Sequence, residues 1–129
     1  MRASMTAILL ADDNPATRSA LVLLLTARLG CADIAVAGDW QALKDASARE
    51  QPVLILLDWE LPGFLPQDGL PELHAIAPGT AVIALSSLPE SDQASKDAGA
   101  RDFIGKCDSP DKVLRIISAA IKFPSKPVE

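Results

Sequence analysis

Three short runs of this sequence are apolar at every position, and they constrain the fold more than any other feature. They span residues 7–11, 53–57 and 81–85. A strand that is apolar on both faces belongs in a sheet that is covered on both sides, which is typical of parallel sheets. Two weaker runs, 32–37 and 100–104, include charged residues, so we expect them nearer the edges of the same sheet.

The segments between these runs have helical patterns. Asn14, followed by a proline, is suited to begin a helix and Gly30 to end it, which predicts a helix over 15–29. A second helix is predicted over 39–49. The clearest helix covers 109–121, where apolar residues recur on one face.

Two further helices are expected to be less regular. We predict one over 71–77, confined by prolines on both sides. The other, over 90–97, is polar on nearly every side, and only Ala94 and Ala98 are suited to face inward. Because such a helix buries little apolar surface, it gains little stability from packing.

Five strands that alternate with five helices predict an α/β fold of the (βα)5 type. Connections between parallel strands are right-handed, which gives an open, doubly wound sheet with helices on both faces. The length of 129 residues fits a single domain over 1–129. We expect its core at about 7–122 and a solvated tail over 123–129.

Composition and charge exclude several classes of protein. A formal net charge of -5 argues against direct binding of nucleic acid. No apolar run approaches the roughly 18 residues of a membrane span, and the N-terminus lacks the pattern of a secretory signal. Cys31 and Cys107 form no metal-binding spacing and suggest no disulfide framework. We therefore expect a cytoplasmic domain that binds neither membrane nor nucleic acid.

Reactive side chains follow four of the five predicted strands. In an open parallel sheet, ligands bind beyond the carboxyl ends of the strands. The residues that stand there are Asp12, Asp13, Asp58, Ser86 and Lys106. Three crowded carboxylates repel one another and favour a hard cation such as Mg²⁺. Asp58 is then placed to act as a nucleophile toward a phosphoryl group, whose oxygens Lys106 and Ser86 would bind.

Four motifs in this order resemble the receiver domain of two-component response regulators. They read LLADDN over 9–14, LLDWELPG over 56–63, ALSS over 84–87 and AGARDFIGK over 98–106. The resemblance extends from about residue 7 to residue 121. It implies a flavodoxin-like fold with strand order 2-1-3-4-5, and a phosphoacceptor in signalling that performs no separate turnover.

The resemblance also implies roles for the matching acidic and basic residues. Asp58 corresponds to the phosphoacceptor, whose donor is a phosphohistidine on a sensor histidine kinase or a histidine phosphotransfer protein. Asp12, Asp13, Asp58 and the backbone carbonyl of Glu60 would hold Mg²⁺, with Mn²⁺ as an alternative. Lys106 corresponds to the lysine that binds the phosphoryl group.

Two further residues match the switch positions of the family. Ser86 corresponds to the switch hydroxyl, and Phe103 to the aromatic residue that reorients with it. We expect phosphorylation to change the face formed by segments 90–97, 100–104 and 109–121, which would bind a partner or form a homodimer.

Two departures from the family pattern are visible. Cys107 follows Lys106 where the family usually has proline, often with a cis bond, so we expect a trans peptide bond there. The loop after Asp58 is about three residues longer than usual around 64–68, and the helix at 71–77 is correspondingly short.

Two other functions are compatible with the same residues. The altered loop leaves open a pseudo-receiver, an interaction module that is not phosphorylated. A small phosphatase that forms an aspartyl phosphate is less favoured: Glu60 stands two residues after Asp58, where an acid would act on the leaving group, but the chain is too short for a substrate-covering cap.

Overall fold

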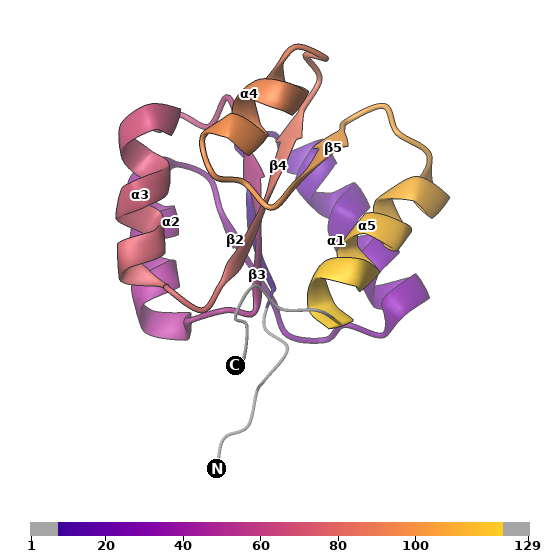
Figure 1. The fold of residues 1–129 in the computed structure, drawn as a ribbon. Coiled ribbons are helices and arrows are strands. Elements are labelled where there is room, and N and C mark those ends of the chain that lie inside the picture. Colours follow the sequence, from indigo (N-terminus) through magenta and orange to yellow (C-terminus); the bar gives the residue numbers. More distant parts are fainter. Residues whose placement is uncertain (1–7, 123–129) are drawn as a thin grey trace.

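The computed structural model describes residues 8–122 as a five-stranded parallel sheet that alternates with five helices (Figure 1). The strands are β1 (Ile8–Ala11), β2 (Ile34–Ala37), β3 (Leu54–Asp58), β4 (Ala81–Ser86) and β5 (Asp102–Gly105). Their order in the sheet is β2-β1-β3-β4-β5, and every pairing is parallel. The predicted flavodoxin-like fold and strand order are confirmed. The predicted tail over 123–129 lies outside the described residues.

The helices cover both faces of this sheet. They are α1 (Pro15–Leu29), α2 (Trp40–Glu50), α3 (Pro66–Ile76), α4 (Ser91–Asp97) and α5 (Pro110–Lys122). Helices α2 and α3 lie on one face and α1 and α5 on the other, while α4 packs beside β4 and β5 (Figure 1). No described helix combines the length and the apolar character that crossing a membrane requires.

The central strands are apolar at every position before their last residues, Asp58 on β3 and Ser86 on β4, because each face of the sheet has its own core. On β3, Ile55 and Leu57 belong to the core beneath α2 and α3, whereas Leu54 and Leu56 belong to the core beneath α1 and α5. All four side chains are fully buried. The edge strand β2 is less covered, with Val36 about half exposed. The other edge strand, β5, is also only partly buried and includes the charged residue Asp102.

Helix α1 begins and ends, and helix α2 begins, as their capping residues predict. The Asn14 side chain accepts hydrogen bonds from the backbone N–H groups of Ala16 and Thr17. Gly30 ends α1 in the left-handed region, at φ 68°, where a residue without a side chain is least strained. The Asp39 carboxylate accepts from the backbone N–H of Ala42 and begins α2.

The prediction for α3 was wrong at its start, because the helix begins at Pro66 rather than at residue 71. Pro66 occupies the first helical turn, where its missing N–H costs nothing. Pro71 lies inside the helix and removes one hydrogen bond, a cost of about 3 kcal/mol. Full burial of Leu70 and Leu73, at about 1.5–3 kcal/mol each, offsets that cost. The expected loop over 64–68 is therefore partly helical.

The inward face of α4 also differs from the prediction. Ala94 is exposed, and the buried residues of the helix are Ser91 and Ser95. Ser95 avoids an unsatisfied hydroxyl because its Oγ donates to the backbone carbonyl of Asp92 at 2.9 Å. Ala98, just after the helix, packs against the core as expected. Helix α4 thus buries two small polar side chains and little apolar surface.

An aromatic cluster holds the loop after β3 against the domain. The Phe64 ring lies 5.0 Å from the Trp40 ring and 5.2 Å from the Trp59 ring, measured between centroids. The backbone N–H of Trp40 also donates to the carbonyl of Pro62 at 2.9 Å. Gly69 on α3 completes the cluster, since a Cβ there would lie 2.7 Å from the Phe64 ring.

We predict that Gly69→Ala destabilises the domain by about 1–3 kcal/mol, because the added methyl group overpacks the Phe64 ring. Gly79→Ala is the matched control, since a Cβ at Gly79 meets no atom within 4 Å. Chemical denaturation of both variants and the wild type measures the difference. Equal stability of the two variants would contradict the packing described for Phe64.

Candidate functional site

The register of the sheet brings the predicted site residues to one edge. Ala11 pairs with Leu57, so Asp12 and Asp58 extend the two adjacent strands β1 and β3 to the same level. On β4 and β5, Ser86 pairs with Gly105, and the backbone N–H of Lys106 donates to the carbonyl of Ser86. Residues that are far apart in sequence therefore meet where the strands end.

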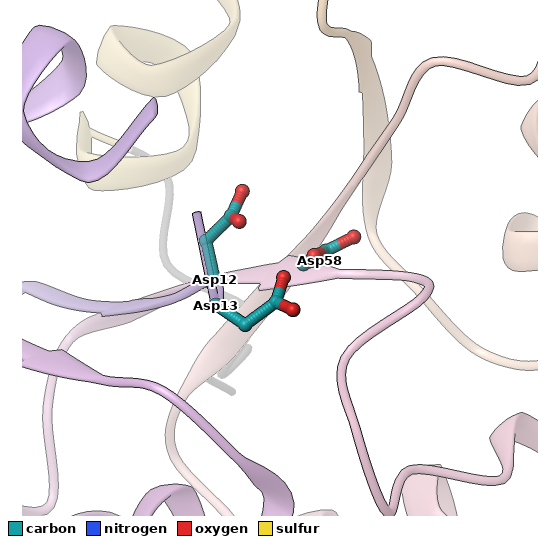
Figure 2. A group of neighbouring side chains, drawn as sticks. All are labelled: Asp12, Asp13 and Asp58. Carbon is teal, nitrogen blue, oxygen red and sulfur yellow. The ribbon is translucent and has the colours of Figure 1, made fainter. Parts of the chain in front are cut away.

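Three carboxylates converge at this edge. One oxygen from each of Asp12, Asp13 and Asp58 lies within 4.8 Å of the others. Figure 2 shows these side chains projecting beyond the ends of β1 and β3. Asp12 and Asp58 are buried, whereas Asp13 is exposed and borders solvent. The cluster has a buried base and one open side.

Lys106 is the counter-charge to the two buried acids. Its Nζ lies 3.0 Å from Asp12 Oδ2 and 3.4 Å from Asp58 Oδ1. The Asp12 side chain is fully buried, that of Asp58 is 3% exposed and that of Lys106 is 23% exposed. Because water screens these charges poorly, the ammonium group offsets much of the repulsion between the carboxylates.

The acids are also held by backbone groups. Asp12 Oδ1 accepts from the N–H of Asn14 at 2.9 Å, and Asp58 Oδ1 accepts from the N–H of Glu60 at 3.0 Å. Arg18 Nη1 donates to the backbone carbonyl of Asp12 at 2.8 Å. These bonds fix the loops after β1 and β3 around the pocket.

The pocket shifts the pKa values of its central pair. Burial raises the pKa of Asp58 above its usual 3.8, and the negative charge of Asp12 adds to this rise. The hydrogen bond from the Glu60 N–H and the charge of Lys106 act in the opposite direction and only partly compensate. Burial alone would lower the pKa of Lys106, but its contacts with Asp12 and Asp58 outweigh burial and raise it. The lysine therefore stays protonated.

Ser86 lies at the end of β4, and its side chain is fully buried. Its Oγ donates to the carboxylate of Glu60, at 3.0 Å from Oε2 and 3.3 Å from Oε1. Sequence reasoning assigned the backbone carbonyl of Glu60 to the metal and gave its carboxylate a role only in the less favoured phosphatase. It therefore missed this side-chain bond to Ser86. A carboxylate two residues after Asp58 is the signal that a sequence offers, but the partner of that carboxylate depends on the β3–β4 pairing.

The other predicted residues flank this pocket. Phe103 on β5 is half-buried and packs against the core on the α2 and α3 side. Trp59 is also half-buried, and its backbone N–H donates to the carbonyl of Leu85. The peptide bond between Lys106 and Cys107 is trans, as predicted.

A model of the response regulator receiver domain matches residues 8–118. This chain belongs to the response regulator receiver domain family. The family consists of signalling phosphoacceptors rather than turnover enzymes, as the sequence predicted, and its members are phosphorylated by histidine kinases. The phosphatase interpretation is therefore not supported.

Relatives and solved structures agree with this family. The chain is 30% identical over 112 residues to the transcriptional activator protein ExaE of Pseudomonas putida, an alignment that covers 85% of this chain and 52% of that protein. The chain thus spans about half the length of this curated relative.

Two solved structures show the shared fold. A CheY-like receiver domain protein from Methanospirillum hungatei JF-1 is 24% identical, with a TM-score of 0.79 over 92% of this chain and 95% of that chain. The receiver domain of sensor histidine kinase PA1611 from Pseudomonas aeruginosa PAO1, which has a magnesium ion coordinated in its active site cleft, is also 24% identical. Its TM-score is 0.78 over 92% of this chain and 99% of that chain.

The donor set of the receiver domain described here fits a hard divalent cation. Asp12, Asp13 and Asp58 supply carboxylate oxygens that lie close enough to share one ion. Mg²⁺ prefers such ligands and retains several waters, which suits a cluster with one exposed carboxylate. The acidic triad can therefore bind a metal.

We predict that Asp58→Asn raises the thermal stability of the metal-free domain at neutral pH. The raised pKa means that folding disfavours the ionised Asp58 carboxyl. The stabilisation by the variant should therefore be small below the usual carboxyl value of 3.8 and grow as the pH rises above it. A gain of about 1 kcal/mol would raise the Tm by about 4 °C.

Thermal unfolding in EDTA across this pH range measures the effect. Asp33→Asn, which removes an exposed acid just before β2, is the control and should show no such gain. A Tm of Asp58→Asn below that of the wild type at pH 7 would contradict the repulsion inferred for the pocket.

Proposed function

We propose that this receiver domain accepts a phosphoryl group on Asp58. The observation that carries the proposal is that the Asp58 carboxylate lies beside those of Asp12 and Asp13 and also 3.4 Å from the Lys106 ammonium group. A nucleophilic carboxylate normally repels a phosphoryl donor. The ammonium group of Lys106 offsets that repulsion at the end of the sheet.

The donor that we propose is a phosphohistidine on a sensor histidine kinase or a histidine phosphotransfer protein. The N–P bond of the donor breaks with its electron pair going to the ring nitrogen, and a bond forms between phosphorus and an Asp58 carboxylate oxygen. A donor ring that is protonated on its other nitrogen then leaves as neutral imidazole. Lys106 binds a phosphoryl oxygen, for which it needs to move little from its present contact with Asp58. The remaining catalysis is positioning and neutralisation of charge.

Asp12, Asp13 and Asp58 are the side chains that would hold Mg²⁺, or Mn²⁺ in its place, and we assign the backbone carbonyl of Glu60 as a further ligand. When bound, the cation neutralises negative charge on the phosphoryl oxygens. Asp13 lies on the solvent-exposed side of the site, while the Asp12 carboxylate holds the Lys106 ammonium group in place.

The output of the domain would be the face formed by α4, β5 and α5. Phe103 lies on β5, and Ser86 ends the adjacent strand β4 opposite Gly105. Helix α4 is short, and its buried residues are Ser91 and Ser95. We propose that the phosphoryl group draws Ser86 toward Asp58, that Phe103 follows, and that the face then binds a partner or a second copy of the chain.

The same proposal extends to the setting of the domain. We treat residues 1–129 as one receiver domain, without direct contact to nucleic acid or membrane, in the cytoplasm where histidine-linked phosphoryl donors are formed.

The second candidate function is a pseudo-receiver that is never phosphorylated. The engagement of Ser86 by Glu60, and of Lys106 by Asp12, favours it, because both phosphate-binding groups already have partners.

We predict that incubation with acetyl phosphate and Mg²⁺ adds one phosphoryl group to the wild-type domain. Intact-mass spectrometry measures the addition, and Asp58→Asn should abolish it because the accepting oxygen is lost. Asp45→Asn, on the exposed surface of α2, is the matched control and should be phosphorylated normally. Absence of any addition to the wild type would favour the pseudo-receiver.

We predict that Mg²⁺ changes the fluorescence of Trp59, which follows Asp58 directly in sequence. Trp40 shares the Phe64 contact, so the variant Trp40→Phe removes the background signal. Titration of Trp40→Phe should show a saturable change that Asp13→Ala weakens by about tenfold or more, because one carboxylate ligand is lost. An unchanged titration curve in the Asp13→Ala variant would contradict the metal site.

A further inference from the structure

The hydroxyl group that should bind the phosphoryl group is already bonded to an acid in the resting domain. Ser86 Oγ donates to both oxygens of the Glu60 carboxylate, with the shorter distance 3.0 Å. The same oxygen accepts from the backbone N–H of Leu88 at 3.0 Å, and Ser91 Oγ lies 3.4 Å away. Ser86 thus joins the loop after β3 to the loop before α4.

A serine hydroxyl has a single proton to donate. While that proton is bonded to the Glu60 carboxylate, Ser86 cannot donate it to a phosphoryl oxygen on Asp58. Hydrogen bonds to an ionised acceptor are about twice as strong as those between neutral groups, so the carboxylate is an effective competitor. Ser86 itself is fully buried, which leaves it few other partners.

We propose that Glu60 is a positioning residue that holds Ser86 in its resting orientation, and that a phosphoryl group on Asp58 displaces the Glu60 carboxylate from the Ser86 hydroxyl. This inference rests on the proposed function and adds the group that opposes switching. The Glu60 carboxylate occupies, in the unphosphorylated domain, the bond that the phosphoryl oxygen would take.

Two connections allow Asp58 to act on Glu60 directly. The backbone N–H of Glu60 donates to Asp58 Oδ1 at 3.0 Å, so the two residues share one turn. Phosphorylation replaces the single negative charge of the Asp58 carboxylate with a charge of about -1.5 to -2 near the Glu60 carboxylate. Phosphorylation therefore repels Glu60 and attracts the Ser86 hydroxyl at the same time, and the loops after β3 and β4 change together.

The first test measures the Leu88 amide, which donates to Ser86 Oγ, in metal-free and phosphate-free protein. Without Glu60 the Ser86 side chain is free to rotate, so Glu60→Ala should speed hydrogen exchange at Leu88 by about fivefold, the factor expected for one net hydrogen bond. Glu60→Gln retains an acceptor oxygen and should give a smaller increase. Exchange in Glu60→Ala equal to that in the wild type would overturn the proposal.

Glu90→Gln is the matched control, because it removes one exposed acid from the loop before α4, and the Glu90 side chain makes no capping hydrogen bond there. Its Leu88 amide should exchange as in the wild type. Acceleration equal to that of Glu60→Ala would show that only the loss of negative charge matters, and would overturn the role of the bond.

A double-mutant cycle measures the bond without relying on exchange. Glu60→Ala, Ser86→Ala and the double variant are compared in chemical unfolding, and the unfolding constants should show a coupling factor of about three to five between the two positions. A factor of one would overturn the proposal.

The final arm separates this inference from the proposed function. After phosphorylation, Leu88 in the wild type and in Glu60→Ala should exchange at the same rate, since Ser86 has left Glu60 in both. A persistent difference would overturn displacement. If the wild type is not phosphorylated, both the proposed function and the displacement of Glu60 fail. If the wild type is phosphorylated but Leu88 exchanges equally fast in unphosphorylated wild type and Glu60→Ala, only the role of Glu60 fails.

Discussion

The ammonium group of Lys106 between Asp12 and Asp58 is the interaction on which the functional edge of this domain depends. Two carboxylates that are almost completely buried would otherwise face each other at the ends of adjacent strands. Their mutual repulsion is strong where water is excluded. Lys106 reduces it, yet the pKa of Asp58 remains raised, so the resting pocket still favours additional positive charge.

This charge imbalance gives the pocket its chemistry. If Lys106 neutralised the carboxylates completely, the pocket would attract a cation only weakly. Three carboxylates with one ammonium group instead retain an excess of negative charge. The same lysine stands within reach of any group added to Asp58. In the resting structure, Asp12 contacts Lys106 and Glu60 contacts Ser86, so internal anions hold the two groups that we propose to bind the phosphoryl group.

The loop between β3 and α3 shows how packing supports such a pocket. Phe64 lies between Trp40 and Trp59, and α3 begins at Pro66 directly behind it. Sequence reasoning placed the start of this helix too late, because it treated Pro71 as a boundary. Burial of Leu70 and Leu73 outweighs the hydrogen bond that Pro71 removes, and this balance depends on neighbours that local sequence does not reveal.

The sequence by itself determined the parallel sheet, because strands that are apolar on both faces require covering helices. Its family motifs determined the strand order. It also determined that the acids and the lysine meet at one edge, because the residues that follow parallel strands lie there. Only the tertiary structure decided that Ser91 and Ser95, rather than Ala94, face inward on α4, and that the Glu60 carboxylate accepts the Ser86 proton. Both outcomes depend on how neighbouring strands and loops place side chains from distant parts of the chain. Local periodicity and spacing carry no information about such contacts, since the energy that selects them comes from the assembled pocket.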